Sequence, residues 1–539
     1  MCLTECGAGV ARTSPDRLLL SDPRICYALY AGQKPRAAFR GRTAMPLFVG
    51  RRDRLQCRSN TGPPFQRYED WVGEPSQKLS YKVKAVDLGY WESPFSETVS
   101  ASTRPMSDDE LLTMVQEASF RYYWEGADPG SGLALENIPG DSGLIAGGAS
   151  GFGIMAILVG AERGFVTREA AAERILRITK FLEKADRFHG AWPHFIDVSG
   201  RVLPLFGKYD NGADLVETSF LVQGLLAARG YFSGTNERER DIVRRITALW
   251  EAVEWDWFRG RDPKEGYLYW HWSPDSTWHI GHRLIGFNET MVTYLLAIAS
   301  PTHGVPAGMY YSGWASQSDF AAKYRSDWGG TKDGDRYVNG KTYYGITLPV
   351  GVGPGGPLFF THYSFMGFDP HAVRDRYTNY FDNNRAISLI NRAYCVANPG
   401  KYVGYGENSW GLTASDNPFG YSAQQPIRHM DNGTISPTAA LSAYAYTPAE
   451  SMAALKHFYR DLGDRLWGPY GFRDAFNISE NWFARTYLAL DQAPIVVMIE
   501  NGRTGAIWRA FMANPEMRPA LDRIAREGST AGATPTPAR

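Results

Sequence analysis

Cysteine is scarce in this sequence, and its spacing suggests no special role. Five cysteines occur in 539 residues, and they match neither a zinc site nor a redox motif. Four of them precede the main domain, so we expect no disulfide framework. Long apolar runs are missing too. Because no stretch reaches about 18 apolar residues, the sequence predicts no membrane-spanning helix.

An excess of charge of either sign is also lacking. Lys plus Arg number 57, as do Asp plus Glu, which leaves a formal net charge of +0. We therefore expect neither nucleic acid nor an anionic membrane as a partner. The HExxH, GxSxG and P-loop motifs are absent, and we predict no metal and no cofactor. The segment GVGPGG at 351–356 lacks the Lys-Ser/Thr ending of a phosphate loop and is interpreted as a plain loop.

Aromatic residues, by contrast, are plentiful. They make up 14% of the chain, with 16 Trp and 30 Tyr. Flat rings with a polar edge suit stacking on sugar faces, although large cores also use them.

The first hundred residues differ in pattern from the rest. Residues 1–43 show no readable period, and we expect them to be poorly ordered. Alternation of apolar and polar residues over 81–86 and 98–101 predicts two strands, similar to the last strands of a fibronectin type III module. We therefore assign 44–105 to a small β-sandwich-like module. Ser107 and Glu110 then form a capping-box pattern that opens a helical region.

Helices dominate from there to about residue 526, in an alternating pattern. Apolar helices at 150–165, 215–232, 289–300 and 436–446 precede or follow charged amphipathic ones at 167–186, 236–255 and 447–466. A helix that is apolar on nearly every side is buried in a large protein. Inner helices enclosed by outer ones would produce this pattern, so we predict a mainly α fold, an α/α toroid over 106–526. The tail at 527–539 is predicted to be disordered.

The stretch YDNGADLVETSFLVQGLLAARGYF carries three acids at the entrance of its apolar helix. Asp210, Asp214 and Glu217 follow an i, i+4, i+7 spacing that places them along one side. One interpretation is a capping box, with Asp214 as N-cap and Glu217 three residues later. The other is that a buried helix points its acids into a cleft. The two are compatible.

Further carboxylates lie among aromatic residues, at Glu289, Glu407, Asp431, Asp474 and Glu500. Paired carboxylates in such surroundings are typical of glycoside hydrolysis, in which one protonates the leaving oxygen and another activates water or attacks. Glu500 beside Arg503 could equally be a structural ion pair, and Asp431 before Asn-Gly could only shape a turn. Histidines in aromatic settings are either structural or contacts for sugar hydroxyls.

Residues 107–526 resemble the glycoamylase-like family whose characterised members are the endo-β-1,2-glucanases and sophorose-releasing enzymes of glycoside hydrolase family 144. The resemblance rests on ASGFGIMAILVGAERGF, the central stretch above, YLYWHWSPD, GPLFFTHYSFMGFDP, GYGENSWGLTASD and DQAPIVVMIENGRTG, among others. It implies an (α/α)6 toroid, no metal, and action on β-1,2-glucan outside the cytoplasm. It also places the active-site acids at Asp210, Asp214, Glu217, Glu289 and Asp474.

The roles within this set follow from chemistry. Glu289 has the most apolar neighbours, which favours a raised pKa and the role of general acid. Asp214 and Glu217, at a helix N-terminus, are expected to stay ionised. Asp214 or Asp474 would then deliver water. Acids from separate walls of a toroid suit the wide spacing of an inverting enzyme. We expect substrate contacts from further polar and aromatic residues: Asp210, Trp192, His194, His271, Trp272, His362, Tyr363, Glu407, Asn408 and Trp410.

The leading hypothesis is thus a monomeric hydrolase of β-1,2-glucan that releases sophorose or short oligosaccharides. A transglycosylase and a non-catalytic glucan-binding protein are the alternatives. We expect a periplasmic or extracellular location, although the N-terminus lacks the charged start and apolar segment of a signal peptide.

Overall fold

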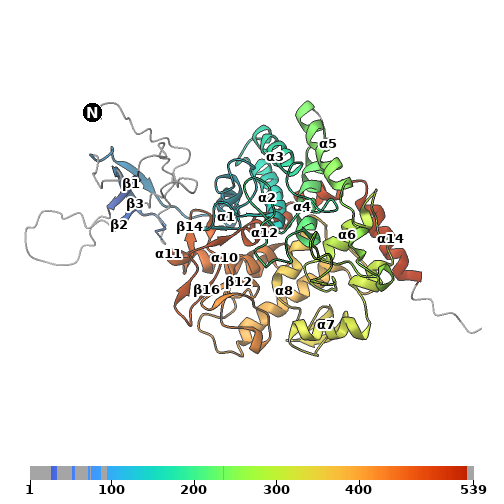
Figure 1. Ribbon diagram of the computed structural model, residues 1–539. Helices are drawn as coiled ribbons and strands as arrows, with labels where there is room; N and C mark the ends of the chain where they lie inside the picture. Colours follow the sequence, from blue (N-terminus) through green and yellow to red (C-terminus); the bar gives the residue numbers. More distant parts are fainter. Residues whose placement is uncertain are drawn as a thin grey trace, which may run out of the picture. The chain divides into compact units, whose positions relative to one another are not determined.

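The computed structural model describes residues 26–32, 51–54, 71–72, 75–86, 94–234 and 236–530 (Figure 1). Its contacts divide the chain into two units. The first holds residues up to Leu111 together with Trp467–Pro469, and the second holds Leu112–Leu466 and Tyr470–Arg539. The domain boundaries expected at 43, 105 and 526 stay predictions.

Within the first unit, four strands form one antiparallel sheet in the order β2-β1-β3-β4. They are β1 (Cys26–Gly32), β2 (Arg51–Arg54), β3 (Lys78–Val86) and β4 (Val99–Ser102). Strands β3 and β4 correspond to the two alternating runs of the sequence. Strand β1 falls in the segment for which we expected no order, because its pairing with β3 rather than its own period defines it. The described residues up to Leu111 contain one sheet, so a β-sandwich and a fibronectin-like module are not confirmed.

The second unit is mainly helical, as the sequence predicts. Its longer helices are α2 (Gly147–Glu162), α3 (Arg168–Leu182), α4 (Leu215–Tyr231), α5 (Glu237–Glu251), α6 (Met291–Ala299), α7 (Asp319–Gly329), α8 (Tyr380–Ala397), α9 (Pro437–Ser442), α10 (Pro448–Arg460), α12 (Ala489–Arg503), α13 (Ala506–Met512) and α14 (Met517–Thr530); α1 spans Asp108–Trp124 and α11 spans Gly463–Leu466. Helix α14 continues into the predicted disordered tail because its apolar side is buried at Leu521 and Ile524. Among the described residues, no helix is both long and apolar enough to cross a membrane.

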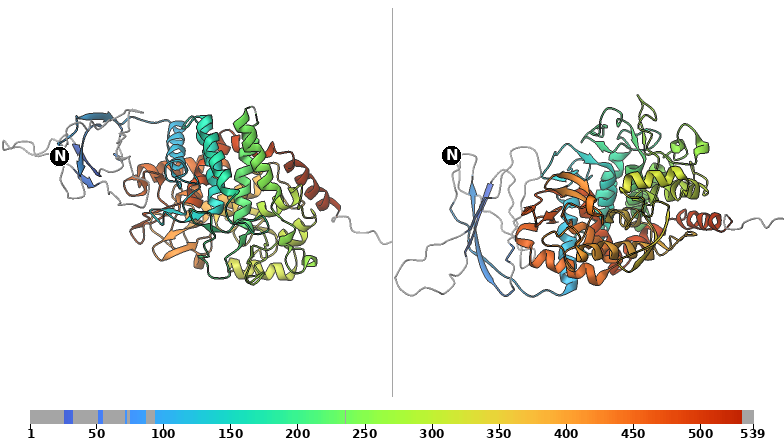
Figure 2. Two further views of the ribbon diagram at one scale, coloured as in Figure 1. Left: turned by 45° about the horizontal axis from the view of Figure 1, so that its top comes forward. Right: turned by 90° about the horizontal axis from the view of Figure 1, so that it is seen from below.

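Buried helices form an inner layer. Helices α2, α4, α6 and α12 are buried along almost their whole length, and each contacts the next, with α12 against α2, α2 against α4 and α4 against α6. Helix α9 packs on α12. The charged helices α3, α5 and α10 bury only one face, and they cover this inner layer. Figure 2 shows α2 to α5 running side by side.

Glycine allows the closest approach between two inner helices. A Cβ on Gly224 of α4 would lie 2.0 Å from the carbonyl oxygen of Gly151 in α2. Real Cβ atoms do not come so close to backbone, so any side chain here would push α2 and α4 apart. The contact therefore fixes the position of α4, whose N-terminus carries the central acids.

Short ladders lie next to the N-termini of the inner helices. Their pairs are β5 (Asn137–Ile138) with β18 (Tyr487–Leu488), β6 (Ile145–Ala146) with β7 (Phe195–Ile196), and β8 (Ala213–Asp214) with β9 (His271–Trp272). The other pairs are β10 (Val338–Tyr343) with β11 (Ile346–Val350), β12 (Ala414–Asn417) with β13 (Gly420–Ala423), and β16 (Phe476–Asn477) with β17 (Trp482–Phe483). Because β18 precedes α12, β6 precedes α2 and β8 precedes α4, these ladders bring the starts of three inner helices and their flanking loops together.

Candidate active site

Asp214 is the N-cap of α4. Its Oδ1 accepts hydrogen bonds from the backbone N–H groups of Val216 at 2.9 Å and Glu217 at 2.8 Å. The side chain is fully buried. The capping interpretation is therefore confirmed for Asp214, and it satisfies two of the free N–H groups of the helix start.

Glu217 does not complete a capping box. Its Oε2 instead accepts from the N–H of Gly148, at the start of α2, at 2.8 Å. The backbone N–H of Asp214, which a capping box would use, donates to the carbonyl of Trp192. The carboxyl of Glu217 therefore serves a site between two helices rather than its own helix end.

His194 lies between these two acids. Its Nδ1 is 3.0 Å from Asp214 Oδ2, and its Nε2 is 3.9 Å from Glu217 Oε1. Burial opposes a charge on the ring, but Glu217, Asp214 and Asp210 outweigh it and raise the pKa of His194 to about 9. At neutral pH His194 is thus a cation, and its Nδ1–H donates to Asp214. Burial also raises the pKa of Asp214, but the charge and hydrogen bond of His194 outweigh this effect. The pKa of Asp214 therefore lies below its usual value.

Two glutamates hold their protons near neutral pH. Burial raises the pKa of Glu217 to about 7, with His194 opposing and Asp214 adding to the shift. Burial, with the charge of Glu217 as a smaller cause, also raises the pKa of Glu289 to about 7. Glu289 lies in the turn before α6, and its raised pKa is what its apolar sequence neighbours predicted. The expectation that Glu217 stays ionised is wrong, because desolvation of a buried carboxylate outweighs the field of the helix N-terminus.

Asp210 and His271 complete this half of the site. Burial and the charge of Asp214 raise the pKa of Asp210 to about 6. His271 is paired across the β8–β9 ladder with Asp214, and its Nε2 lies 3.6 Å from Asp214 Oδ2. Burial lowers the pKa of His271 to about 4, so this ring stays neutral beside the charged His194.

A second group of acids surrounds Asp474. Its Oδ2 accepts from the backbone N–H of Asp416 at 2.6 Å, and its carboxyl hydrogen-bonds that of Asp491 in the first turn of α12. Glu136 adjoins the β5–β18 ladder, and its backbone oxygen accepts from the N–H of Ala489. Glu136 interacts electrostatically with Glu217, His194 and Asp491. The two groups of acids therefore form one cluster.

Aromatic side chains lie next to this acid cluster, and two of them are exposed to solvent. The phenol of Tyr363 hydrogen-bonds Asp491 and also lies near Glu289. Tyr421, on the β12–β13 hairpin, has its hydroxyl near Asp474 and Asp491, while the residue is 60% exposed. Phe206 is 70% exposed and meets the ring of His194 edge-on, with 4.9 Å between centroids. An apolar ring surface beside acids fits a sugar ligand.

Comparisons with known proteins agree with this chemistry. The family model "Putative glucoamylase" (Glycoamylase) matches residues 281–515. The exo β-1,2-glucooligosaccharide sophorohydrolase (non-reducing end) of Parabacteroides distasonis is 56% identical over 488 residues, which are 90% of this chain and 66% of that protein. The crystal structure of β-1,2-glucanase from Parabacteroides distasonis has a TM-score of 0.86 and 53% identity, over 95% of this chain and 71% of that one. The endo-β-1,2-glucanase from Chitinophaga pinensis, in complex with sophorotriose and glucose, has a TM-score of 0.72 and 46% identity, over 78% of this chain and 99% of that one.

The chain belongs to the glycoamylase-like family of glycoside hydrolases. The fold prediction of an (α/α)6 toroid for the helical unit is confirmed with it. The chain spans 66% of the length of its sophorohydrolase relative.

Three of the residues that we expected to bind substrate have buried side chains. Trp192, Trp410 and His362 are almost completely buried, and the indole N–H of Trp192 donates to the carbonyl of Leu182. Their side chains pack in the interior. An aromatic residue in a polar loop has the same sequence pattern whether it is buried or binds a ligand. Glu407 and Asn408 are exposed in a loop, and within the described part of the chain no hydrogen bond or ion pair joins their side chains to the acid cluster.

Trp272 is partly exposed and packs on His189, with 4.7 Å between ring centroids. Of the two acids with structural alternatives, Glu500 forms a buried ion pair with Arg163 at 2.6 Å. Asp431 accepts from the phenols of Tyr394 and Tyr405. Both therefore act in structure.

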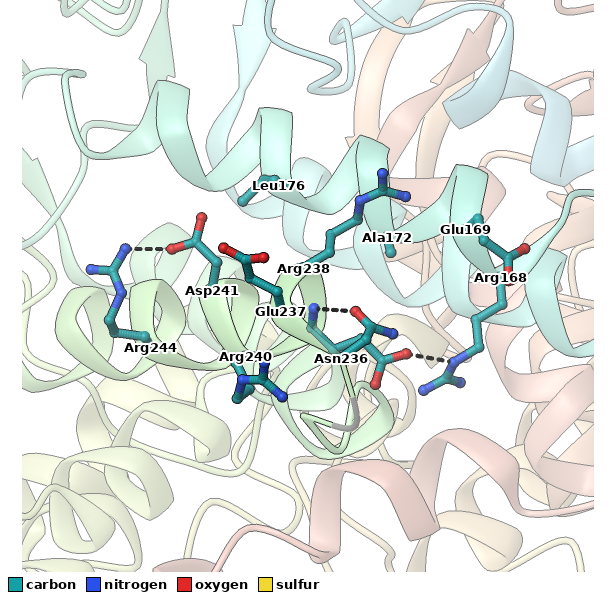
Figure 3. Close-up of a pocket in the computed structure, with 11 residues that line it drawn as sticks. Arg168, Glu169, Ala172, Leu176, Asn236, Glu237, Arg238, Arg240, Asp241 and Arg244 are labelled. Atoms are coloured by element: carbon teal, nitrogen blue, oxygen red, sulfur yellow. Dashed lines mark hydrogen bonds and ion pairs between the residues drawn. The ribbon is translucent and has the colours of Figure 1, made fainter.

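One open groove has a lining that contains none of the residues of the acid cluster. It has a volume of about 1090 Å³ and runs between α3 and α5, the outer helices (Figure 3). Its charges largely neutralise one another, as Arg168 pairs with Glu239 at 2.9 Å and Arg244 with Asp241. The raised pKa values of Glu217 and Glu289 lie in the acid cluster, and we assign the chemistry to that cluster.

Proposed function

We propose that this chain hydrolyses β-1,2-linked glucan and releases sophorose or short β-1,2-gluco-oligosaccharides. The observation that carries the proposal is the pair Glu217 and Glu289, two carboxyls with pKa values of about 7 in one acid cluster. A glycosidase needs one acid that is protonated near neutral pH and one group that accepts a proton from water. The relatives' names report β-1,2-glucan substrates for those proteins.

Within the acid cluster, Glu289 is the best donor to the leaving oxygen. It is only partly buried, so a glycosidic oxygen can reach it, and its raised pKa keeps the proton available. Asp214 is not suited to deliver water, because its oxygens already accept from two backbone N–H groups and from His194. Asp214 holds His194 in place instead. The water-activating role then remains with Asp474, the other candidate from the sequence.

Exposed rings would hold the glucan. Phe206 lies beside His194, and Tyr421 lies beside Asp474, so the two rings flank opposite halves of the acid cluster. Sugar rings stack on such surfaces, while the acids contact the hydroxyls and the glycosidic oxygen.

Product analysis tests the function and its stereochemistry. We expect the enzyme to shorten linear β-1,2-glucan and to leave matched β-1,3- and β-1,4-glucans intact. We expect inversion, which would release the α-anomer first, because the donor and the base belong to separate segments and acids from separate segments suit the wide carboxyl spacing of an inverting enzyme. Proton NMR in the first minutes, before mutarotation, identifies the anomer. Longer products and an initial β-anomer would instead indicate a retaining transglycosylase.

The predictions of a periplasmic or extracellular location and of a monomer stay predictions. A polymeric glucan is a substrate that an enzyme meets outside the cytoplasm, which supports the first. Fractionation of cells and light scattering of the purified chain test the two directly.

A further inference from the structure

The carboxyl groups of Asp474 and Asp491 lie within hydrogen-bond reach of each other. Both side chains are almost fully buried, with exposures of 2% and 3%. Their positions are fixed independently of this contact. The backbone N–H of Asp474 donates to Thr486 just before β18, and the backbone oxygen of Asp491 accepts from Thr438 Oγ1 of α9 at 2.7 Å.

Two carboxylates cannot hydrogen-bond each other, because an ionised carboxylate has only acceptors. One of the two must therefore carry a proton. Asp474 Oδ2 already accepts from the N–H of Asp416. Its Oδ1 is buried and has no N–H or O–H donor among the described residues. A proton on Oδ1, donated to Asp491, satisfies this otherwise unpaired atom.

We propose that Asp491 is a positioning residue that acts through Asp474: the two carboxyls share one proton and accept the proton of the attacking water as a unit. This inference rests on the proposed hydrolase function. Like-charged acids in contact resist double ionisation, and such a pair keeps a single negative charge. Asp491 carries no signal in the sequence beyond an acid in the first turn of a helix.

Water gives a proton to Asp474, and the proton already on Asp474 passes to Asp491. The water oxygen forms its bond to the anomeric carbon while the glycosidic bond breaks, and Glu289 gives its proton to the leaving oxygen. The pair gains one proton and Glu289 loses one, so no other reactant is needed.

The ionisation of the pair suits this role. Burial, followed by the charge of Asp491, raises the pKa of Asp474 well above its usual value. Burial raises the pKa of Asp491 to about 7. Other titratable groups facing Asp491 are the carboxyls of Asp416 and Glu136 and the hydroxyls of Tyr363, Tyr421 and Tyr123. The charges of Asp416 and Glu136 raise the pKa of Asp491 further. The pair therefore takes up its second proton near neutral pH, where a general base works best.

The pH profile of kcat/KM distinguishes this role from a structural one. In Asp491→Asn the shared proton that stabilises the single negative charge is gone, so we expect the acid limb to move up by about one pH unit or more, with kcat lowered at least about tenfold. The alkaline limb, set by Glu289, should stay. Asp431→Asn is the matched control, since Asp431 is a buried acid held by Tyr394 and Tyr405, and neither limb should move. An unmoved acid limb in Asp491→Asn overturns the proposal.

Infrared spectroscopy of the substrate-free protein gives a second test that is independent of activity. At about pH 8.5, above the pKa values of Glu217 and Glu289, the wild-type chain should keep the carbonyl band of one protonated carboxyl. Asp474→Asn and Asp491→Asn should each lose it. Because the wild-type spectrum needs no variant, its lack of the band refutes the shared proton even if the variants do not fold. A band without β-1,2-glucanase activity would leave the pair intact and contradict only the proposed function.

Discussion

Glu217→Gln separates catalysis from helix capping, since the substitution removes one ionisable group with little change in shape. The side-chain amide oxygen of Gln can still accept from the N–H of Gly148, where Glu217 accepts at 2.8 Å. The loss of one hydrogen bond costs about 1 kcal/mol, and here the bond is kept. We therefore expect the free energy of unfolding to change by no more than about 1 kcal/mol at acidic pH, where Glu217 is itself neutral.

The expected effect on rate is much larger. Glu217 is an acid of the same cluster, and its charge acts on the proposed donor Glu289. We expect its loss to cost as much as that of a positioned acid or base, at least about a hundredfold in turnover, which corresponds to about 2.7 kcal/mol in the activation barrier. Release of sophorose from a β-1,2-gluco-oligosaccharide measures kcat, and a melting curve of the same sample shows that the variant is folded. Glu500→Gln is the control: Glu500 is equally buried but pairs with Arg163, so it should lose stability and keep activity. A destabilised Glu217→Gln protein with nearly full activity would refute the catalytic assignment.

The same variant should also change the pH dependence of stability. The pKa of Glu217 is about 7 in the folded chain against 4.5 for the free side chain. Between these values the folded state binds more protons than the unfolded state, so stability falls as pH rises through this window. Glu217→Gln should flatten that decline. Melting temperatures measured from pH 4.5 to 7 on both proteins test the sign, and an unchanged slope would show that Glu217 is not protonated in the folded chain.

Three further predictions follow from the site and the fold. His194 has a pKa of about 9 in the folded chain against 6.5 when free, so the stability it contributes is present below pH 6.5 and lost as pH rises through about 9; melting curves of His194→Gln should lack this loss. Gly148→Ala should lower both activity and melting temperature, because a Cβ there would lie 2.4 Å from Glu217 Oε2 and 2.9 Å from Phe220, and overpacking of this kind costs about 1–3 kcal/mol. Deleting the residues before Pro105 should leave a helix-rich chain that melts cooperatively, which a far-ultraviolet spectrum dominated by strand would contradict.

The sequence revealed the helical architecture because burial leaves a mark on every helix. An inner helix such as α2 is apolar on all sides, and an outer one such as α3 is apolar on one side only, so the alternation can be read without any tertiary information. The strand β1 lacks such a mark. Its pairing with β3 is a contact between distant segments, and local patterns do not record it.

The acid cluster was predicted unevenly for a similar reason. Asp210, Asp214 and Glu217 share one helix start, and their spacing alone places them together. Asp491 and Glu136 join the cluster through the β5–β18 ladder, which pairs segments about 350 residues apart, so no local spacing indicates them. Trp192, Trp410 and His362 show a different difficulty, because their side chains are buried. Rings in a polar loop suggest a binding surface, yet the interior of a large toroid also needs rings to fill it.

Electrostatic repulsion among the acids of the cluster determines which of them are ionised. Several carboxylates brought together in a poorly solvated region cannot all be ionised, because each charge adds to the cost of the next. Asp214 keeps its charge by sitting beside the protonated His194. Asp474 gives up its charge by holding a proton toward Asp491, and Glu217 and Glu289 balance near neutrality. The cluster thus contains protonated and ionised carboxyls side by side at one pH. An enzyme that cleaves a glycosidic bond with a donor and an acceptor of protons needs both forms at once. Burial and mutual repulsion make these carboxylates unfavourable. The same two effects give the acids of the cluster different pKa values.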